Sequence, residues 1–420
     1  MATGARQDGR LKWLMLALAS IAIAGSYYTY DSLAPVTGML RTQRGLSQAQ
    51  IGLLGAMTSL PNIPLSLLGG LLIDRFGTAR SVAAFAAICF AGAALTAVDG
   101  PFALMAAGRL LFGFGQETLL IALLAGLAQW FHAARAALAM SLLFSLARVG
   151  SYMADISPGW APGFYAGGWQ PPLLLAAGLT AISLVGALAY WAIDRRHGPA
   201  AAGGTHGWSG MLDLGGFDRS FWYILTLNVL FASVFFPFRS TFAIVYFQDA
   251  KGLTLAAAGL VNSWVFFTAI FATPLFGMIA DRFGHRAMML AIGAALMPLT
   301  FLTLGATHWS LWISTAMMGL AFSVVPAVIW PATAMLVAPR RLGTAYGLIN
   351  VLQSLGLTVC NFAAGWLNDA NGAGPAHPAG YAPMLWLFGL LATVSFAATV
   401  ALWVRESGPY GHGLNSAIGR

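Results

Sequence analysis

The sequence predicts an all-α membrane protein in which twelve transmembrane helices form two pseudo-symmetric six-helix bundles. Three observations predict this fold. The 420-residue chain is 59% hydrophobic and only 8% charged. Its apolar segments have the length of membrane-spanning helices, and one short polar motif recurs at the same place in both halves. Because soluble domains carry about 25% charged residues, the composition excludes an ordinary soluble protein.

The apolar segments fall into two groups of six, and each is long enough to cross a hydrocarbon core of about 30 Å. They cover residues 12–39, 50–73, 80–98, 102–131, 135–158 and 171–193, then 219–248, 255–280, 286–305, 309–337, 342–368 and 381–404. Residues 194–218 between the groups are polar and glycine-rich, which is typical of a linker. We therefore expect an N-terminal bundle over 1–193, a cytoplasmic linker over 194–218 and a C-terminal bundle over 219–420.

The basic residues are distributed unevenly between the two sides of the membrane. Most of the 21 Lys and Arg residues fall on the side of the N-terminus, and only Arg41, Arg44 and Lys251 fall on the other side. This bias predicts that both termini are cytoplasmic. It also explains the net charge of +8 without a nucleic-acid partner.

The sequence gives no sign of a metal site, a cofactor or an enzyme. Cys89 and Cys360 lie in apolar runs without metal-ligand spacing, and none of the seven histidines lies in the middle of a segment. The chain contains no H-E-x-x-H, G-x-S-x-G or P-loop pattern, so neither a hydrolase nor an ATP-driven pump is expected.

An acid and a base are expected at the same membrane depth. The apolar segments 102–131 and 135–158 meet at a basic turn, F-H-A-A-R, and Glu117 and Arg148 each lie about 22 Å from it at 1.5 Å per residue. Ionisable groups in the middle of a membrane are costly and usually functional, so this pair is the first candidate site. The alternative is a permanent salt bridge that serves structure.

The second half has no equivalent pair, since Val324 and Leu355 hold the corresponding positions. We therefore expect the N-terminal bundle to recognise substrate charge and the C-terminal bundle to supply shape and uncharged contacts. Polar residues also recur every three or four positions around Arg148, which suits a cavity wall or close helix packing. Four aspartates are expected near outer helix ends, where water is available: Asp31, Asp155, Asp249 and Asp369.

The repeated motif follows the second and the eighth segments, as G-G-L-L-I-D-R-F-G-T-A-R and G-M-I-A-D-R-F-G-H-R. Glycine permits a tight turn between helices, aspartate can cap or pair across the loop, and the arginines favour the cytoplasmic face. Matched loops in tandem halves are typical of transporters. The motif residues are Asp74, Arg75, Gly77 and Arg80 in the first half, and Asp281, Arg282, Gly284 and Arg286 in the second.

These loops resemble the cytoplasmic signature of the major facilitator superfamily. R-L-L-F-G-F-G, which begins at Arg109, likewise resembles the R-x-x-x-G-x-G motif of its fourth helix. The resemblance implies two six-helix bundles, a central cavity and transport by alternating access, and it groups Arg109 with the gating motif. Arg80 departs slightly from the pattern, since it lies one residue farther from its aspartate than Arg286 does.

A narrower resemblance covers several stretches in order, among them GSYYTYD (25–31), GRLLFGFGQETL (108–119), LARVGS (146–151) and LGTAYGLINVLQSLG (342–356). Together they resemble the family of major facilitator superfamily domain-containing protein 1, the lysosomal dipeptide transporters, and its prokaryotic relatives. In that family an acid on the fourth helix and an arginine on the fifth engage the charged ends of a dipeptide, and Glu117 and Arg148 match them.

The resemblance implies that Arg148 binds the substrate carboxylate through its guanidinium fork and that Glu117 accepts from the amino terminus. The remaining wall would be adaptable, with contacts from Tyr27, Tyr30, Phe238, Asn262, Trp330 and Gln353. Tyr30 and Trp330 are favoured because each combines an apolar ring with a polar group. Small organic anions, such as mono- or dicarboxylates, and amino acids are the alternative substrates.

Coupling and location are expectations at this stage. The sequence leaves open whether the transporter is a uniporter or a proton symporter, and whether Glu117 carries the proton. The animal family member has a glycosylated accessory subunit and a lysosomal sorting signal. No such signal is evident here, so we expect the protein to lie in the lipid bilayer of the inner (plasma) membrane. We also expect it to be a monomer.

Overall fold

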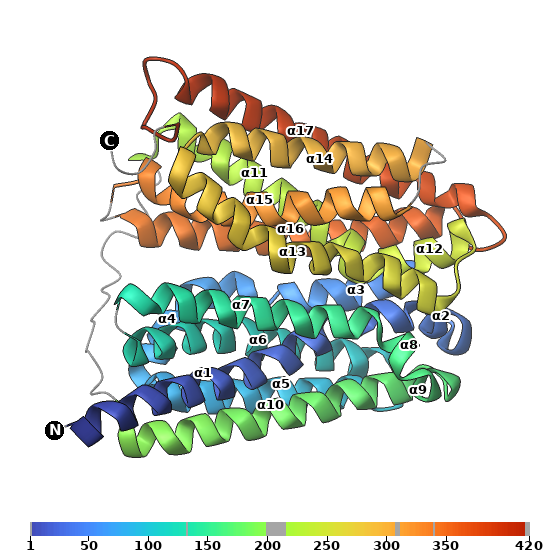
Figure 1. Ribbon diagram of the computed structural model, residues 1–420. Helices are drawn as coiled ribbons and strands as arrows, with labels where there is room; N and C mark the ends of the chain where they lie inside the picture. Colours follow the sequence, from blue (N-terminus) through green and yellow to red (C-terminus); the bar gives the residue numbers. More distant parts are fainter. Residues whose placement is uncertain (1, 132, 199–215, 307–310, 339–340, 416–420) are drawn as a thin grey trace. The chain divides into compact units, whose positions relative to one another are not determined.

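The computed structural model describes residues 2–131, 133–198, 216–306, 311–338 and 341–415, which are helical over nearly their whole length (Figure 1). Most of the predicted linker 194–218 lies outside these residues. The chain divides into two compact units: unit 1 is Met1–Gln43 with Met57–Gly207, and unit 2 is Arg44–Ala56 with Trp208–Arg420. The bundle boundaries expected from the sequence stay a prediction.

Unit 1 contains seven long helices and two short ones. They are α1 (Ala2–Asp31), α2 (Leu33–Arg44), α4 (Asn62–Phe76), α5 (Thr78–Thr96), α6 (Phe102–Trp130), α7 (Ala133–Asp155), α8 (Ser157–Trp160), α9 (Pro162–Ala166) and α10 (Gln170–His197). Helix α3 (Gln48–Ser59) begins in unit 2 and ends in unit 1.

Unit 2 contains the remaining helices. They are α11 (Arg219–Pro237), the π-helix η2 (Phe238–Phe242), α12 (Ala243–Lys251), α13 (Leu255–Phe283), α14 (Arg286–Ala306), α15 (Leu311–Leu336), α16 (Leu342–Ala370), the 3₁₀-helix η4 (Pro378–Tyr381) and α17 (Ala382–Glu406). Cys89 on α5 and Cys360 on α16 are both free and buried, one in each unit.

Ten helical segments in the described part of the chain are long and apolar enough to cross a membrane, and they match ten of the predicted spans. The predicted span 50–73 is not among them because it folds as two shorter helices, α3 and α4, on either side of Pro61. Proline lacks the N–H that would continue a helix. The predicted span 135–158 forms α7, which is also not among the ten.

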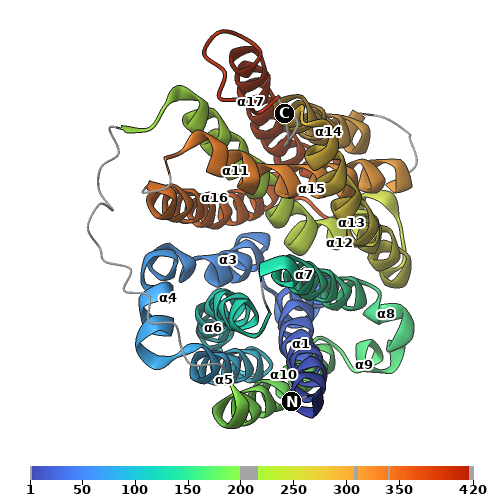
Figure 2. The ribbon, with the colours of Figure 1, turned by 60° about the vertical axis from the view of Figure 1, so that its left-hand side comes forward.

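The two units use the same helix pairings, which can be followed end-on in Figure 2. In unit 1, α1 packs on α7 and α10, α5 packs on α6 and α10, and α4 packs on α6. In unit 2, α11 packs on α16 and α17, α14 packs on α15 and α17, and α13 packs on α15. Each unit-2 helix is the repeat equivalent of its unit-1 counterpart, so the predicted pseudo-symmetry is confirmed.

The two motif loops each turn at a glycine with positive φ. Gly77 after α4 has φ 82° and Gly284 after α13 has φ 69°, both in the left-handed region that favours glycine. Their final arginines differ, because Arg80 is exposed whereas Arg286 is buried. The backbone N–H of Arg286 donates to the carbonyl of Leu414 at 3.0 Å, which ties the C-terminal tail to α14. Among the other motif residues, Arg75 and Arg282 are exposed, and the side chains of Asp74 and Asp281 lie outside the description.

The first span of each unit is interrupted at the same repeat position. In unit 1, α1 ends at Asp31, four residues before Pro35, whose missing N–H leaves the Asp31 carbonyl without its helical donor. In unit 2, α11 ends at Pro237 and the π-helix η2 follows. Ser32 at the first break and Arg239 in η2 are repeat equivalents, so the interruption belongs to both halves of the fold.

An ion-pair network joins the start of α11 to the end of α17. The carboxylate of Asp218 accepts from the backbone N–H of Ser220 at 2.9 Å and from the Arg405 guanidinium at 2.8 Å. Burial would raise the pKa of Asp218, but the Ser220 and Arg219 backbone N–H groups together with Arg405 lower that pKa below its ordinary value.

This network predicts a pH dependence of stability. Because the pKa of Asp218 is lower in the folded than in the unfolded protein, its stabilising contribution is complete above the unfolded pKa of about 3.9 and is lost as pH falls through the folded pKa. We expect the melting temperature of Asp218→Asn to lie below that of the wild type at pH ~6, with the gap closing towards pH ~3. Asp99→Asn, an exposed site, is the control. A gap that does not change with pH would contradict the prediction.

Candidate functional site

Glu117 on α6 and Arg148 on α7 are both half-buried in unit 1. The two helices are in contact, and the charge of Arg148 acts electrostatically on Glu117. The acid and base predicted at the same depth are therefore neighbours in space.

Two tyrosines of α1 lie among these charges. The guanidinium carbon of Arg148 is 5.7 Å from the ring centre of Tyr27, within the range of a cation–π interaction. Tyr27 interacts electrostatically with Arg148 and Glu117, and Tyr30 interacts with Glu117 and Arg109. The structure thus brings together four of the predicted contact residues: Tyr27, Tyr30, Glu117 and Arg148.

Glycine allows α1 and α7 to approach closely enough for this arrangement. A Cβ atom built on Gly150 would collide with the backbone carbonyl oxygen of Ala24 on α1. Gly150 lies two residues after Arg148, so this close contact brings the part of α7 that carries Arg148 against α1, the helix of Tyr27. On the opposite side of α1, the Ser183 hydroxyl of α10 donates to the carbonyl of Ile21 at 3.0 Å.

Gly150→Val should therefore weaken both stability and transport. The added side chain has no space against the Ala24 carbonyl, and overpacking of this kind costs about 1–3 kcal/mol. We expect a lower melting temperature and slower uptake, because Arg148 moves away from Tyr27 as the helices separate. Gly178→Val on α10 is the matched control, since nothing lies within 4 Å of its added Cβ. Equal behaviour of the two variants would argue against a tight contact.

Arg109 is buried, with 4% of its surface exposed, and it supports the interrupted end of α1. Its guanidinium donates to the carbonyls of Thr29 and Tyr30, both at 3.2 Å. These acceptors lie in the last turn of α1, which ends at Asp31. Arg109 thus satisfies backbone groups at the end of α1, and its expected part in gating stays a prediction.

The expected access of Asp31 and Asp155 to water is wrong in this structure, since they are 1% and 0% exposed. The charge of Asp31 acts on Arg109 and on both Tyr27 and Tyr30. Asp31 therefore extends the cluster by a second acid, which the sequence argument missed. Its spacing of four residues before Pro35 is the signal that could have revealed a helix break there.

The polar positions of α7 change in burial along the helix. Ser141 is exposed, Ser145 and Arg148 are half-buried, and Ser151 and Asp155 are buried. The predicted polar stripe thus becomes progressively enclosed towards the end of α7.

Two residues of unit 2 that were predicted to contact substrate, Gln353 and Trp330, are half-buried and accept hydrogen bonds from neighbouring helices. The Asn228 amide on α11 donates to Oε1 of Gln353 on α16 at 2.7 Å. The Tyr346 hydroxyl donates to the Trp330 carbonyl at 3.2 Å, and the two rings are 5.5 Å apart. Asn228 and Tyr346 were not singled out from the sequence, because each acts through a partner on another helix.

The other two predicted contacts of unit 2 are buried. Phe238 packs against Phe301 and Phe388, with ring centres 5.2 Å and 6.2 Å away. Asn262 donates to the Arg239 carbonyl at 3.2 Å and so satisfies the backbone of η2. The guanidinium carbon of Arg239, a 0% exposed residue, is 3.8 Å from the ring centre of Phe266. The assignment of Phe238 and Asn262 to the substrate site stays a prediction.

Comparison with known proteins decides the family. Residues 16–256 and 224–419 match the Major Facilitator Superfamily. The chain belongs to this superfamily. It is similar to the lysosomal dipeptide transporter MFSD1 of Danio rerio, with 31% identity over 364 residues that cover 83% of this chain and 78% of that protein. The Homo sapiens protein of the same name is 30% identical over 374 residues, covering 86% and 80%.

Solved structures agree on the fold. The crystal structure of the nucleoside transporter NupG superimposes with a TM-score of 0.77, covering 93% of this chain and 99% of that one, at 15% identity. As a member of the major facilitator superfamily, this protein is a multi-pass membrane transporter of a small molecule. The predictions of family, transporter function and absence of an enzyme activity are confirmed.

Proposed function

We propose that this major facilitator carries dipeptides, with Arg148 binding the substrate carboxylate and Glu117 binding its amino terminus. The proposal rests on one observation: an acid and a base interact electrostatically on adjoining helices, beside two tyrosines of α1. The similarity to transporters named for dipeptides supports this class of substrate.

The chemistry of a dipeptide fits such a pair. Its two ends carry opposite charges, so the carboxylate can accept two hydrogen bonds from the fork of Arg148 while the ammonium donates to Glu117. Hydrogen bonds to charged groups contribute about 1.5–3 kcal/mol each. Without substrate, Glu117 and Arg148 interact with each other. A bound dipeptide would replace that interaction with two, one between its carboxylate and Arg148 and one between its ammonium and Glu117.

Uncharged side chains would complete recognition. Because Oε1 of Gln353 accepts from Asn228, the amide nitrogen of Gln353 keeps donors for a peptide carbonyl. The ring and indole N–H of Trp330 would contact the variable side chains of the substrate. These roles rest on the dipeptide proposal.

We further propose a monomer in the inner membrane with cytoplasmic termini. Two acids are candidates for proton coupling, the half-buried Glu117 and the buried Asp31, and each interacts with an arginine in unit 1. Uptake measured with and without an imposed pH gradient distinguishes a proton symporter, which the gradient accelerates, from a uniporter, which it does not.

A competition experiment tests the substrate class. Purified protein in liposomes is given labelled dialanine, and competitors are added at equal concentration: dialanine, alanine, N-acetyl-dialanine, dialanine amide and lactate. We expect dialanine to compete best and each blocked peptide to compete about tenfold less well, because one charged contact is lost. Competition by lactate equal to that of dialanine would favour an organic-anion transporter instead.

A further inference from the structure

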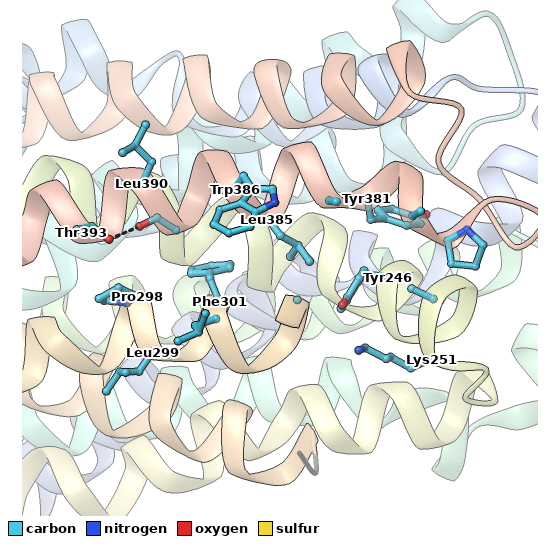
Figure 3. A pocket seen from close by; sticks show the side chains of 17 residues that line it. Tyr246, Lys251, Pro298, Leu299, Phe301, Tyr381, Leu385, Trp386, Leu390 and Thr393 are labelled. Atoms are coloured by element: carbon cyan, nitrogen blue, oxygen red, sulfur yellow. Dashed lines mark hydrogen bonds between the residues drawn. The ribbon is translucent and has the colours of Figure 1, made fainter. Parts of the chain in front are cut away.

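A groove on unit 2 lies between α14 and α17 and ends at α12 and η4 (Figure 3). Its volume is about 560 Å³. Figure 3 shows Tyr246 and Lys251 towards one end, and Leu390 and Thr393 towards the other. The walls expose large apolar side chains, among them Leu302, Trp386 and Leu390. In a membrane-spanning protein such a surface is solvated by lipid chains.

The ammonium of Lys251, at one end of the groove, uses only part of its hydrogen-bonding capacity within the protein. The ammonium of Lys251 donates to the Leu304 carbonyl at 2.9 Å, and the Tyr246 hydroxyl donates to the same carbonyl at 2.8 Å. An ammonium has three donors, so this contact orients the group without exhausting it. Among the described residues no carboxylate forms an ion pair with Lys251. Asp249, two positions away in sequence, accepts from the Tyr381 hydroxyl at 2.6 Å.

The length of the groove matches one leaflet. Along α17 it extends from Ala382 to Thr393, which is about 17 Å at 1.5 Å per residue. Half of a hydrocarbon core of about 30 Å is ~15 Å. One end of the groove is thus lined by Lys251, Tyr246 and Tyr381, and the rest has apolar walls over about the length of one acyl chain.

We propose that this groove binds an anionic phospholipid, whose phosphate contacts Lys251 and one acyl chain of which lies between α14 and α17. The charge of Lys251 selects an anionic headgroup over a zwitterionic one, and an exposed tryptophan such as Trp386 favours the interfacial region of a bilayer. The apolar walls select a lipid over a soluble phosphate, which has nothing to place between the helices.

Lipid binding to the purified full-length protein in detergent tests the proposal. Native mass spectrometry measures the affinities of dioleoyl phosphatidylglycerol and dioleoyl phosphatidylcholine. We expect phosphatidylglycerol to bind about fivefold more tightly, the contribution of one basic residue near a lipid surface. Lys251→Gln should remove this preference. Lys12→Gln is the matched control, because Lys12 and Lys251 are the two lysines of the chain.

A second variant tests the groove itself. An added Cβ at Gly389 meets only the Cβ of Phe301, at 3.6 Å, so Gly389→Leu places its larger side chain in the groove without a backbone clash. We expect it to weaken binding of both lipids. Equal affinities for the two lipids in the wild type, or an unchanged preference in Lys251→Gln, would overturn the proposal. So would displacement of phosphatidylglycerol by an equal concentration of glycerol phosphate, which would show a soluble anion site.

Discussion

Arg148→Ala is expected to reduce dialanine uptake in proteoliposomes by about a hundredfold, which corresponds to ~2.7 kcal/mol. The variant removes the donors for the substrate carboxylate and leaves Glu117 without the cation that acts on it. The initial rate at substrate concentrations below saturation is the measurement, because it reports the binding energy of the charged contact.

Arg148→Lys separates charge from geometry. Lysine keeps the positive charge but lacks the planar fork, so uptake should fall by about tenfold. Lys12→Gln, a loss of charge at the start of the chain, should have wild-type uptake. Full activity in Arg148→Ala would exclude Arg148 from the substrate site.

Glu117→Gln is expected to reduce dialanine uptake by about thirtyfold, or ~2 kcal/mol, and to leave weak competition by N-acetyl-dialanine unchanged. The amide is nearly isosteric with the carboxylate but carries no charge to pair with the substrate ammonium. The acetylated peptide has no ammonium to lose, so the two substrates distinguish recognition of the amino terminus from a general defect.

Asp99→Asn is the control for loss of a carboxylate, because Asp99 is exposed between α5 and α6. The same variants can be assayed with an imposed pH gradient. If Glu117→Gln keeps the response to pH, Glu117 is not the coupling acid and Asp31→Asn becomes the variant to measure.

Composition and apolar segment length predicted the helical membrane fold well, and the repeated D-R-F-G motif predicted its two halves. The left-handed backbone at Gly77 and Gly284 follows from the same motif. Segment length alone cannot show where an apolar run divides, which is why one span was predicted over 50–73 where the chain forms α3 and α4 on either side of Pro61. It also cannot show that α3 begins in one unit and ends in the other.

The Glu117–Arg148 pair could be predicted because both residues lie at equal distances from a recognisable turn. Burial of Asp31 could not, because position along a helix indicates depth in the membrane but not which face meets another helix. The same limit applies to Asn228, whose hydrogen bond to Gln353 crosses from α11 to α16. Such contacts depend on the rotation of each helix about its axis, which weak amphipathicity leaves undefined.

The two buried cysteines have a practical consequence. Cys89 lies in unit 1 and Cys360 in unit 2, and both are shielded from solution. Thiol reagents should therefore leave the native chain unlabelled, so that cysteines introduced at exposed positions outside the motif loops, such as Asp99 and Ala376, can carry spin labels or fluorophores without prior removal of the natural ones. Distances between such probes would follow the transport cycle in an otherwise unaltered protein.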